Sequence, residues 1–123
     1  MEAVANLKSE LDQFCGTEAY HKFSLSPISK LVMTDGVKYL CDKARCFWLM
    51  DIIASYQNKC NKDEMLREFQ VWTLTVNNGK GVVKCERDTN DVFLTQNIPH
   101  TDFPLDEIKL YCINGVILLP SEY

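Results

Sequence analysis

Six cysteines and two histidines are the residues best suited to metal binding or nucleophilic chemistry in this chain of 123 residues. Structural zinc sites need closely spaced ligands, so that one loop supplies two of them. The closest cysteines, Cys41 and Cys46, straddle an expected junction between a strand and a helix, and neither His21 nor His100 has a cysteine nearby in the sequence. We therefore expect no metal site.

Cys46 is the best candidate for a reactive thiol, because it follows Arg45 near the start of an expected helix. A helix N-terminus and a neighbouring cation both favour the thiolate. Such a nucleophile also needs a base, for which only His21 and His100 are available, and neither has a recognisable context. A reduced cysteine packed in the core is the favoured interpretation for Cys46 and for the other five cysteines.

Acidic residues are concentrated between residues 86 and 107, where six acids face one base, Arg87, for a net charge of −5. The six are Glu86, Asp88, Asp91, Asp102, Asp106 and Glu107. The whole chain carries −4 and has no basic stripe, so direct nucleic-acid binding is not expected. Clustered acids favour encounter with a positively charged protein. We expect these six residues to bind a basic protein partner.

No cofactor is expected, because the five glycines form neither a dinucleotide-binding nor a phosphate-binding motif. The segment 78–81 (Asn-Gly-Lys-Gly) has residues typical of a turn, and no helix is expected to follow it as in a phosphate-binding loop. Nor does the sequence indicate two acids converging in a catalytic cleft, since most acids lie in expected turns and loops.

Hydrophobic periodicity predicts two helices followed by a β-rich half. Residues 2–14 have the spacing of an amphipathic helix, and residues 45–59 are apolar on most of the helical circumference, as in a buried central helix. Asp35-Gly36 predicts a hairpin over residues 31–41. Residues 20–26 alternate weakly, as in a short strand, and Asp63 is expected to cap a helical turn at 64–68. Further strands are expected at 69–76, 82–87, 92–96, 108–113 and 116–119, with Asn114-Gly115 turning the last hairpin.

The composition, 46% hydrophobic and 24% charged, is that of one globular domain spanning residues 1–123. The fold class is α+β: an antiparallel β-meander of five to six strands packed on the buried central helix, with the N-terminal helix alongside. The strands carry apolar residues on both faces. The face away from the central helix is either a partner surface or covered by the N-terminal helix.

Residues 34–40 (Thr-Asp-Gly-Val-Lys-Tyr-Leu) and 48–57 (Trp-Leu-Met-Asp-Ile-Ile-Ala-Ser-Tyr-Gln) carry a family resemblance. They resemble the T-D-G-V-x-Y-L turn-strand and W-L-x-D-x-I-x-S-x-Q helix of a small family of domains of unknown function from bacteria, phages and plasmids. Residues 69–72 (Phe-Gln-Val-Trp) share this likeness, which spans about residues 15–80. The resemblance implies a mobile-element context and brings no catalytic residue.

The functional hypothesis is a non-enzymatic interaction protein, for example an inhibitor of a host nucleic-acid-binding or defence protein. No apolar run could span a membrane and no secretory signal is visible, so a cytoplasmic location without membrane association is expected. One alternative is a small enzyme with a Cys/His site near Cys46. Another is a homodimer formed through a sheet face or an edge strand.

Overall fold

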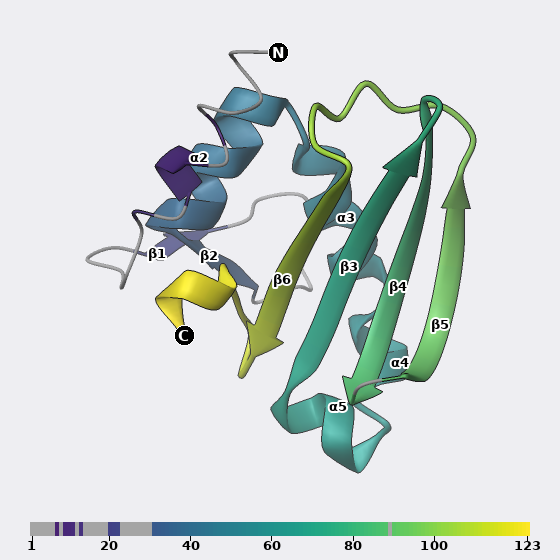
Figure 1. Cartoon of the computed structure of the whole chain (residues 1–123). Helices are drawn as coiled ribbons and strands as arrows, with labels where there is room; N and C mark the ends of the chain where they lie inside the picture. The colour runs from purple at the N-terminus through teal and green to yellow at the C-terminus, as the bar shows by residue number, and fades with distance from the viewer. Residues whose placement is uncertain (1–6, 8, 12, 14–19, 23–30, 89) are drawn as a thin grey trace.

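The computed structural model describes residues 7, 9–11, 13, 20–22, 31–88 and 90–123. A seven-stranded sheet in the order β1-β2-β7-β6-β3-β4-β5 organises these residues (Figure 1). Its strands are β1 (Tyr20–Lys22), β2 (Val32–Thr34), β3 (Gln70–Asn77), β4 (Lys80–Asp88), β5 (Asp91–Ile98), β6 (Glu107–Ile113) and β7 (Val116–Leu118). All neighbours pair antiparallel except β2 and β7, which are parallel. The α+β class and its mostly antiparallel sheet are confirmed.

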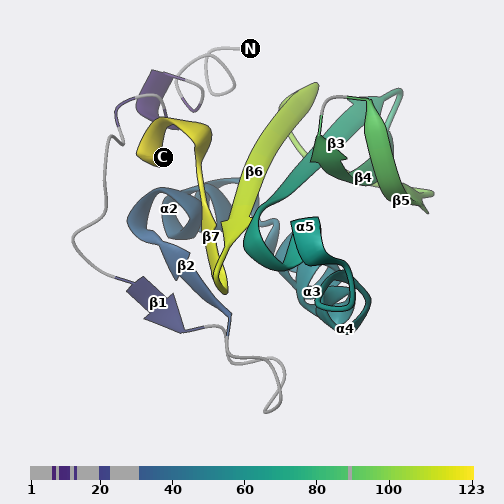
Figure 2. The same ribbon diagram turned by 90° about the horizontal axis from the view of Figure 1, so that it is seen from below.

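Between β2 and β3 lie the helices α2 (Asp35–Ala44), α3 (Phe47–Ser55), α4 (Gln57–Cys60) and α5 (Glu64–Glu68). A 3-10 helix, η1 (Pro120–Glu122), follows β7. The helices α3, α4 and α5 gather on one side of β3, β4 and β5, and the described residues leave the other side uncovered (Figure 2). We call these the covered face and the open face.

The covered face holds the core. Alternate β3 residues Gln70, Trp72 and Leu74 are buried there, whereas Val71 and Thr73 are only half-buried on the open face. Leu49, Met50 and Ile53 of α3 are buried in the same cluster as Trp72 and Leu74. Strand alternation therefore gives one face to packing and leaves the other to solvent.

The hairpin expected over residues 31–41 is wrong, because β2 ends at Thr34 and α2 begins at Asp35. Thr34 is the N-cap residue, and its Oγ1 accepts a hydrogen bond from Val37 N. A hairpin turn would need positive φ at both central residues. Positive φ occurs instead at Asn78-Gly79 and Asn114-Gly115, where two-residue turns join β3 to β4 and β6 to β7.

The helix expected over residues 45–59 is divided into α3 and α4 at Tyr56, and Arg45 stands before it in the left-handed region. The expected turn at 64–68 is α5, and its cap by Asp63 is confirmed. The expected N-terminal helix falls largely outside the described residues. Residues 7 and 9–11 are helical, and Leu7 and Leu11 are buried.

The described part of that N-terminal segment lies against α2 and η1. The Tyr39 hydroxyl of α2 donates to Glu10, and the Ser121 hydroxyl of η1 donates to Leu11 O. The sheet also departs from a simple meander. The longest run of consecutive neighbouring strands is β3, β4 and β5, and β6 crosses to the other side of β3.

Candidate functional site

The three residues of the expected Cys/His site are placed apart. His21 lies in β1 and His100 lies two residues beyond the end of β5, so they belong to opposite edges of the sheet. Six strand spacings of about 4.8 Å separate those edges. Cys46, the N-cap residue of α3, has no exposed surface, and its thiol donates to Leu40 O. No thiol–imidazole pair is formed from these residues.

The five described cysteines are free and buried. They are Cys41, Cys46, Cys60, Cys85 and Cys112. A hydrogen bond with Cys46 and burial raise the pKa of Cys41. A hydrogen bond with Cys60 and burial likewise raise the pKa of Cys85. Burial raises the pKa of Cys112 to about 12. Thiols held protonated in this way are packing residues rather than nucleophiles.

Among the described residues no group of three or more His, Cys, Asp or Glu side chains could hold a metal ion. No helix in the described part of the chain is long and apolar enough to cross a membrane.

The acidic segment does not form one surface. Glu86, Asp88 and Asp91 lie where β4 passes into β5, whereas Asp102, Asp106 and Glu107 lie beyond the far end of β5 or at the start of β6 (Figure 1). Along β3, Glu86 lies level with Val71 and Glu107 level with Thr75, so about 13 Å of strand separates the nearest members of the two groups. The structure therefore brings together only the first three acids.

Asp91 is already engaged within the chain. The Arg87 guanidinium donates through Nε and a terminal nitrogen to both Asp91 carboxylate oxygens, at 3.1 and 3.2 Å, and to Asp63 Oδ2 at 2.7 Å. These carboxylates raise the pKa of Arg87. Arg87 thus ties the cap of α5 to the β4–β5 end, and Glu86, which lies beside Val71 on the other face of β4, remains the acid best placed for a partner.

The residues of the T-D-G motif build the start of α2 against the C-terminal segment. The Glu122 carboxylate accepts hydrogen bonds from Thr34 Oγ1 at 2.6 Å, Gly36 N at 3.2 Å and Leu119 N at 3.0 Å. A Cβ on Gly36 would stand 2.6 Å from Leu119 Cδ1 and 2.7 Å from Glu122 Oε1. A side chain at residue 36 would make Leu119 and Glu122 shift, so the motif packs the start of α2 against the C-terminal segment.

Gln70, from the Phe-Gln-Val-Trp segment, joins the covered face to the helices. Its Oε1 accepts from Trp72 Nε1 at 2.8 Å and from Gln57 Nε2 at 2.9 Å. Its Nε2 donates to Leu66 O at 3.0 Å and to Gln57 Oε1 at 2.9 Å. The amide is 2% exposed and fully satisfied, so these residues too are architecture.

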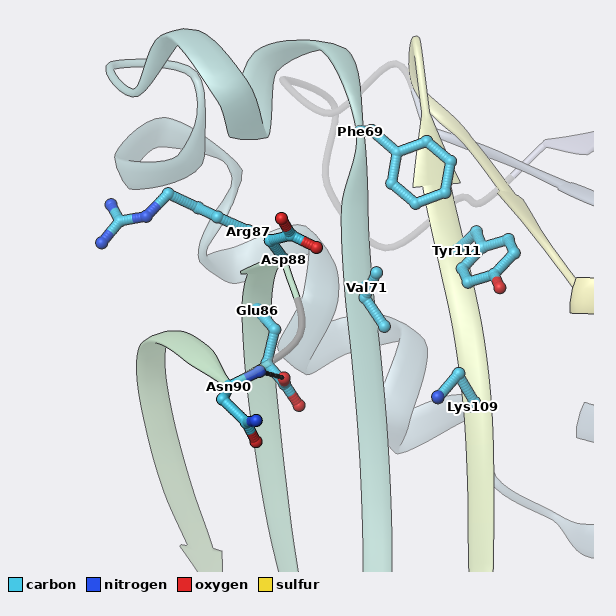
Figure 3. Close-up of a pocket in the computed structure, with 8 residues that line it drawn as sticks. All are labelled: Phe69, Val71, Glu86, Arg87, Asp88, Asn90, Lys109 and Tyr111. Atoms are coloured by element: carbon cyan, nitrogen blue, oxygen red, sulfur yellow. Dashed lines mark hydrogen bonds between the residues drawn. The ribbon is translucent and has the colours of Figure 1, made fainter.

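A pocket of about 300 Å³ lies on the open face, at the end of the sheet where β4 finishes (Figure 3). The lining residues are Phe69, Val71, Glu86, Arg87, Asp88, Asn90, Lys109 and Tyr111. Val71 lies in the middle, with Phe69 and Tyr111 on one side and Glu86 on the other, while the Arg87 side chain points away. We call this the aromatic–acidic pocket.

The aromatic wall is a packed cluster of three rings. The Phe69 and Tyr111 centroids are 4.9 Å apart, and Tyr123 meets both edge to face, at 5.5 and 5.7 Å. Such tilted and T-shaped contacts hold rings in a defined orientation. Opposite this wall, Glu86 receives a 3.2 Å hydrogen bond from Asn90 N.

The next row of the open face is basic. Thr73 pairs with Lys109 on β6 and with Lys84 on β4, and both lysines are exposed. Thr73 Oγ1 is the buried side-chain oxygen without a hydrogen-bond partner in the described part of the chain. The open face therefore carries both acids and lysines.

The fold and site define the chain as a small α+β domain whose sheet is covered by helices on one face and hollowed by a pocket on the other. It belongs to the family of unknown function DUF6876, whose model matches residues 5–123. This match confirms the expectation that the chain belongs to a family of unknown function. No curated protein and no solved structure matches the chain.

Sequence reasoning missed the pocket residues Phe69, Val71, Lys109 and Tyr111 as site residues. Phe69 and Tyr111 are more than forty positions apart and meet only because β6 pairs with β3. Alternation along each strand could have placed Val71 and Tyr111 away from the core, but not beside each other.

Proposed function

We propose that this chain is a non-enzymatic protein-interaction module that binds a basic segment of a partner protein at the aromatic–acidic pocket. One observation carries the proposal: two carboxylates and a wall of packed rings line the same hollow, on the sheet face opposite α3, α4 and α5. Aromatic residues beside charged groups are typical of protein-binding surfaces.

The proposal narrows the acidic surface to Glu86 and Asp88. Asp91 is committed to Arg87, and the acids at 102–107 lie at the other end of the sheet. A net charge of −4 supports a basic protein rather than a nucleic acid as partner. Inhibition of a host nucleic-acid-binding or defence protein, in a phage, plasmid or bacterial setting, is the form of this function that we propose.

The Cys/His enzyme is not proposed, because Cys46 is buried and the two histidines belong to opposite sheet edges. A homodimer stays a prediction. Strand β5 has a neighbour on one side only among the described strands, and light scattering of the purified protein would show whether two copies associate.

The test compares two neutralised variants of similar charge change. Glu86→Gln with Asp88→Asn removes the pocket carboxylates, and Asp102→Asn with Glu107→Gln removes two exposed acids at the other end. Each variant and the wild-type protein are used to retain proteins from cells of the source, and thermal unfolding verifies that both variants fold.

We expect a basic protein to be retained by the wild type and by the distal variant but lost from the pocket variant. Retention by all three proteins would overturn the proposal, as would a partner lost only from the distal variant. Direct titration of the purified partner then gives the loss of affinity, which we expect to be at least about tenfold for two buried or half-buried charge contacts.

A further inference from the structure

We infer that the aromatic–acidic pocket takes the guanidinium group of an arginine from the partner, in preference to a lysine ammonium. The inference rests on the proposed function, because it names what enters the same pocket. Its evidence is the register of three strands and a second arrangement elsewhere in this molecule.

Strand pairing places a ring and a carboxylate on either side of a small floor residue. Tyr111 pairs with Val71, and Val71 pairs with Glu86, so the three lie in one row across β6, β3 and β4. Adjacent strands are about 4.8 Å apart, which separates Tyr111 from Glu86 by about 9–10 Å at the backbone. A flat group lying over Val71 can therefore stack on the ring and reach the carboxylate together.

Glu86 has hydrogen-bonding capacity left for such a group. In the described part of the chain its carboxylate receives one hydrogen bond, from Asn90 N to Oε2, although an ionised carboxylate can accept about four. Its side chain is directed into the pocket beside Asn90 (Figure 3). The first residue of the neighbouring basic row, Lys109, stands at the other end of the hollow.

The chain already holds a guanidinium in this manner on its covered face. Arg87 Cζ lies 5.2 Å from the centroid of the Phe93 ring while two of its nitrogens donate to the Asp91 carboxylate. The pocket offers the same two elements, a ring and a carboxylate, without an arginine of its own between them.

Arginine fits these elements better than lysine. A guanidinium is planar, stacks on aromatic faces and binds a carboxylate through two parallel hydrogen bonds. A lysine ammonium is a compact, strongly hydrated charge. It can lie over a ring, as Lys59 does over Tyr56, but it is not planar and cannot form the two parallel hydrogen bonds to a carboxylate. An anionic ligand is disfavoured at the end of the hollow that Glu86 and Asp88 line, whereas Lys109 lines its other end.

Nuclear magnetic resonance of the ¹⁵N-labelled full chain provides the test, with N-acetyl-arginine amide and N-acetyl-lysine amide as probes. We expect the arginine probe to shift the backbone amides of Val71, Glu86 and Tyr111, with an affinity about fivefold higher than that of the lysine probe. Glu86→Gln should abolish these shifts, and Glu107→Gln, on the same face but at the far end of β6, should leave them unchanged.

Equal responses to the two probes, shifts confined to other residues, or full binding by Glu86→Gln would each overturn the arginine assignment. These outcomes are separate from failure of the proposed function. If the pocket variant still loses the partner while the probes are not distinguished, the pocket is the partner site and only the arginine assignment is wrong. Thermal unfolding of Glu86→Gln verifies that a lost shift is not a lost fold.

Discussion

Gln70 and Val71 are neighbours on β3, and they lie in opposite environments. Gln70 faces the helices, where four hydrogen bonds to the chain itself use the donors and acceptors of its amide. Val71 faces outward and forms the floor of the aromatic–acidic pocket. Residues 86 and 87 repeat the contrast, with Arg87 bound to two carboxylates and Glu86 receiving one hydrogen bond.

This difference separates polar groups whose hydrogen bonds stabilise the fold from polar groups that have hydrogen-bonding capacity left for a binding partner. Buried polar atoms normally find partners within the protein, as those around Gln70 do. Thr73 Oγ1 and the Glu86 carboxylate fall short of that on the open face. We therefore assign the polar groups of the covered face to the stability of the fold, and we propose that those of the open face bind a partner.

The largest expected effect is the loss of the Gln70 amide. Gln70→Met keeps the size of the side chain but leaves Trp72 Nε1 and Leu66 O buried without partners, which should lower the free energy of unfolding by about 3 kcal/mol. Urea denaturation measures this. Gln96→Met is the control, because it removes one hydrogen bond, from the Tyr56 hydroxyl, and should cost about 1 kcal/mol. Equal losses would contradict the special role of the Gln70 amide.

Gly36→Ala should lower the free energy of unfolding by about 2 kcal/mol, because the new methyl group would push Leu119 and Glu122 away from the start of α2. Thermal and urea unfolding measure the change. Gly79→Ala, at a turn with φ of 73° and open space around it, separates backbone strain from steric overlap. Tolerance of alanine at residue 36 would show that the C-terminal segment can shift at little cost.

Thr73→Val should raise the free energy of unfolding by about 1 kcal/mol, because it replaces a buried hydroxyl that has no partner with a methyl group of similar shape. Thr75→Val, at an exposed position on the same face of β3, should change stability by less than about 0.5 kcal/mol. A destabilised Thr73→Val protein would mean that the hydroxyl is satisfied in solution.

The smallest expected effect is on the free energy of unfolding at acidic pH. The Leu66 backbone N–H and then Arg87 lower the pKa of Asp63 below its ordinary value of 3.8. A carboxyl with a lowered folded-state pKa stabilises the protein above its unfolded-state value, and that contribution is lost as the pH falls through the folded-state pKa. Asp63→Asn should flatten this part of the curve of unfolding free energy against pH, measured by urea titration between about pH 5 and about pH 2. Parallel curves would contradict the prediction.

Strands and turns were largely predictable from the sequence, because their signals are local. Asn114-Gly115 turns a hairpin as expected, and β3 and β4 follow their apolar runs. The hairpin predicted from Asp35-Gly36 was wrong, because the same dipeptide also suits the first turn of a helix after a capping threonine. The buried positions of α2, Val37, Leu40, Cys41 and Ala44, have helical spacing, and this signal could have decided against the hairpin.

The site was less predictable, because it depends on contacts between distant parts of the chain. Six acids within 22 residues suggested one surface, but an intervening strand carries half of them to the other end of the sheet. The pocket needs β6 beside β3, a pairing that no local pattern specifies. The resemblance was confirmed at the level of the family, and its motif residues serve the core and the start of α2.

The bond between Thr34 and Glu122 has a consequence for the order in which the protein is made. It joins residues 88 positions apart, and β2 also pairs with β7 from the same late segment. At about 5–20 residues per second, a ribosome needs on the order of ten seconds to add the intervening chain. Throughout that time the start of α2 and the inner edge of β2 lack their partners, so the nascent chain depends on residues 116–122 to close the fold.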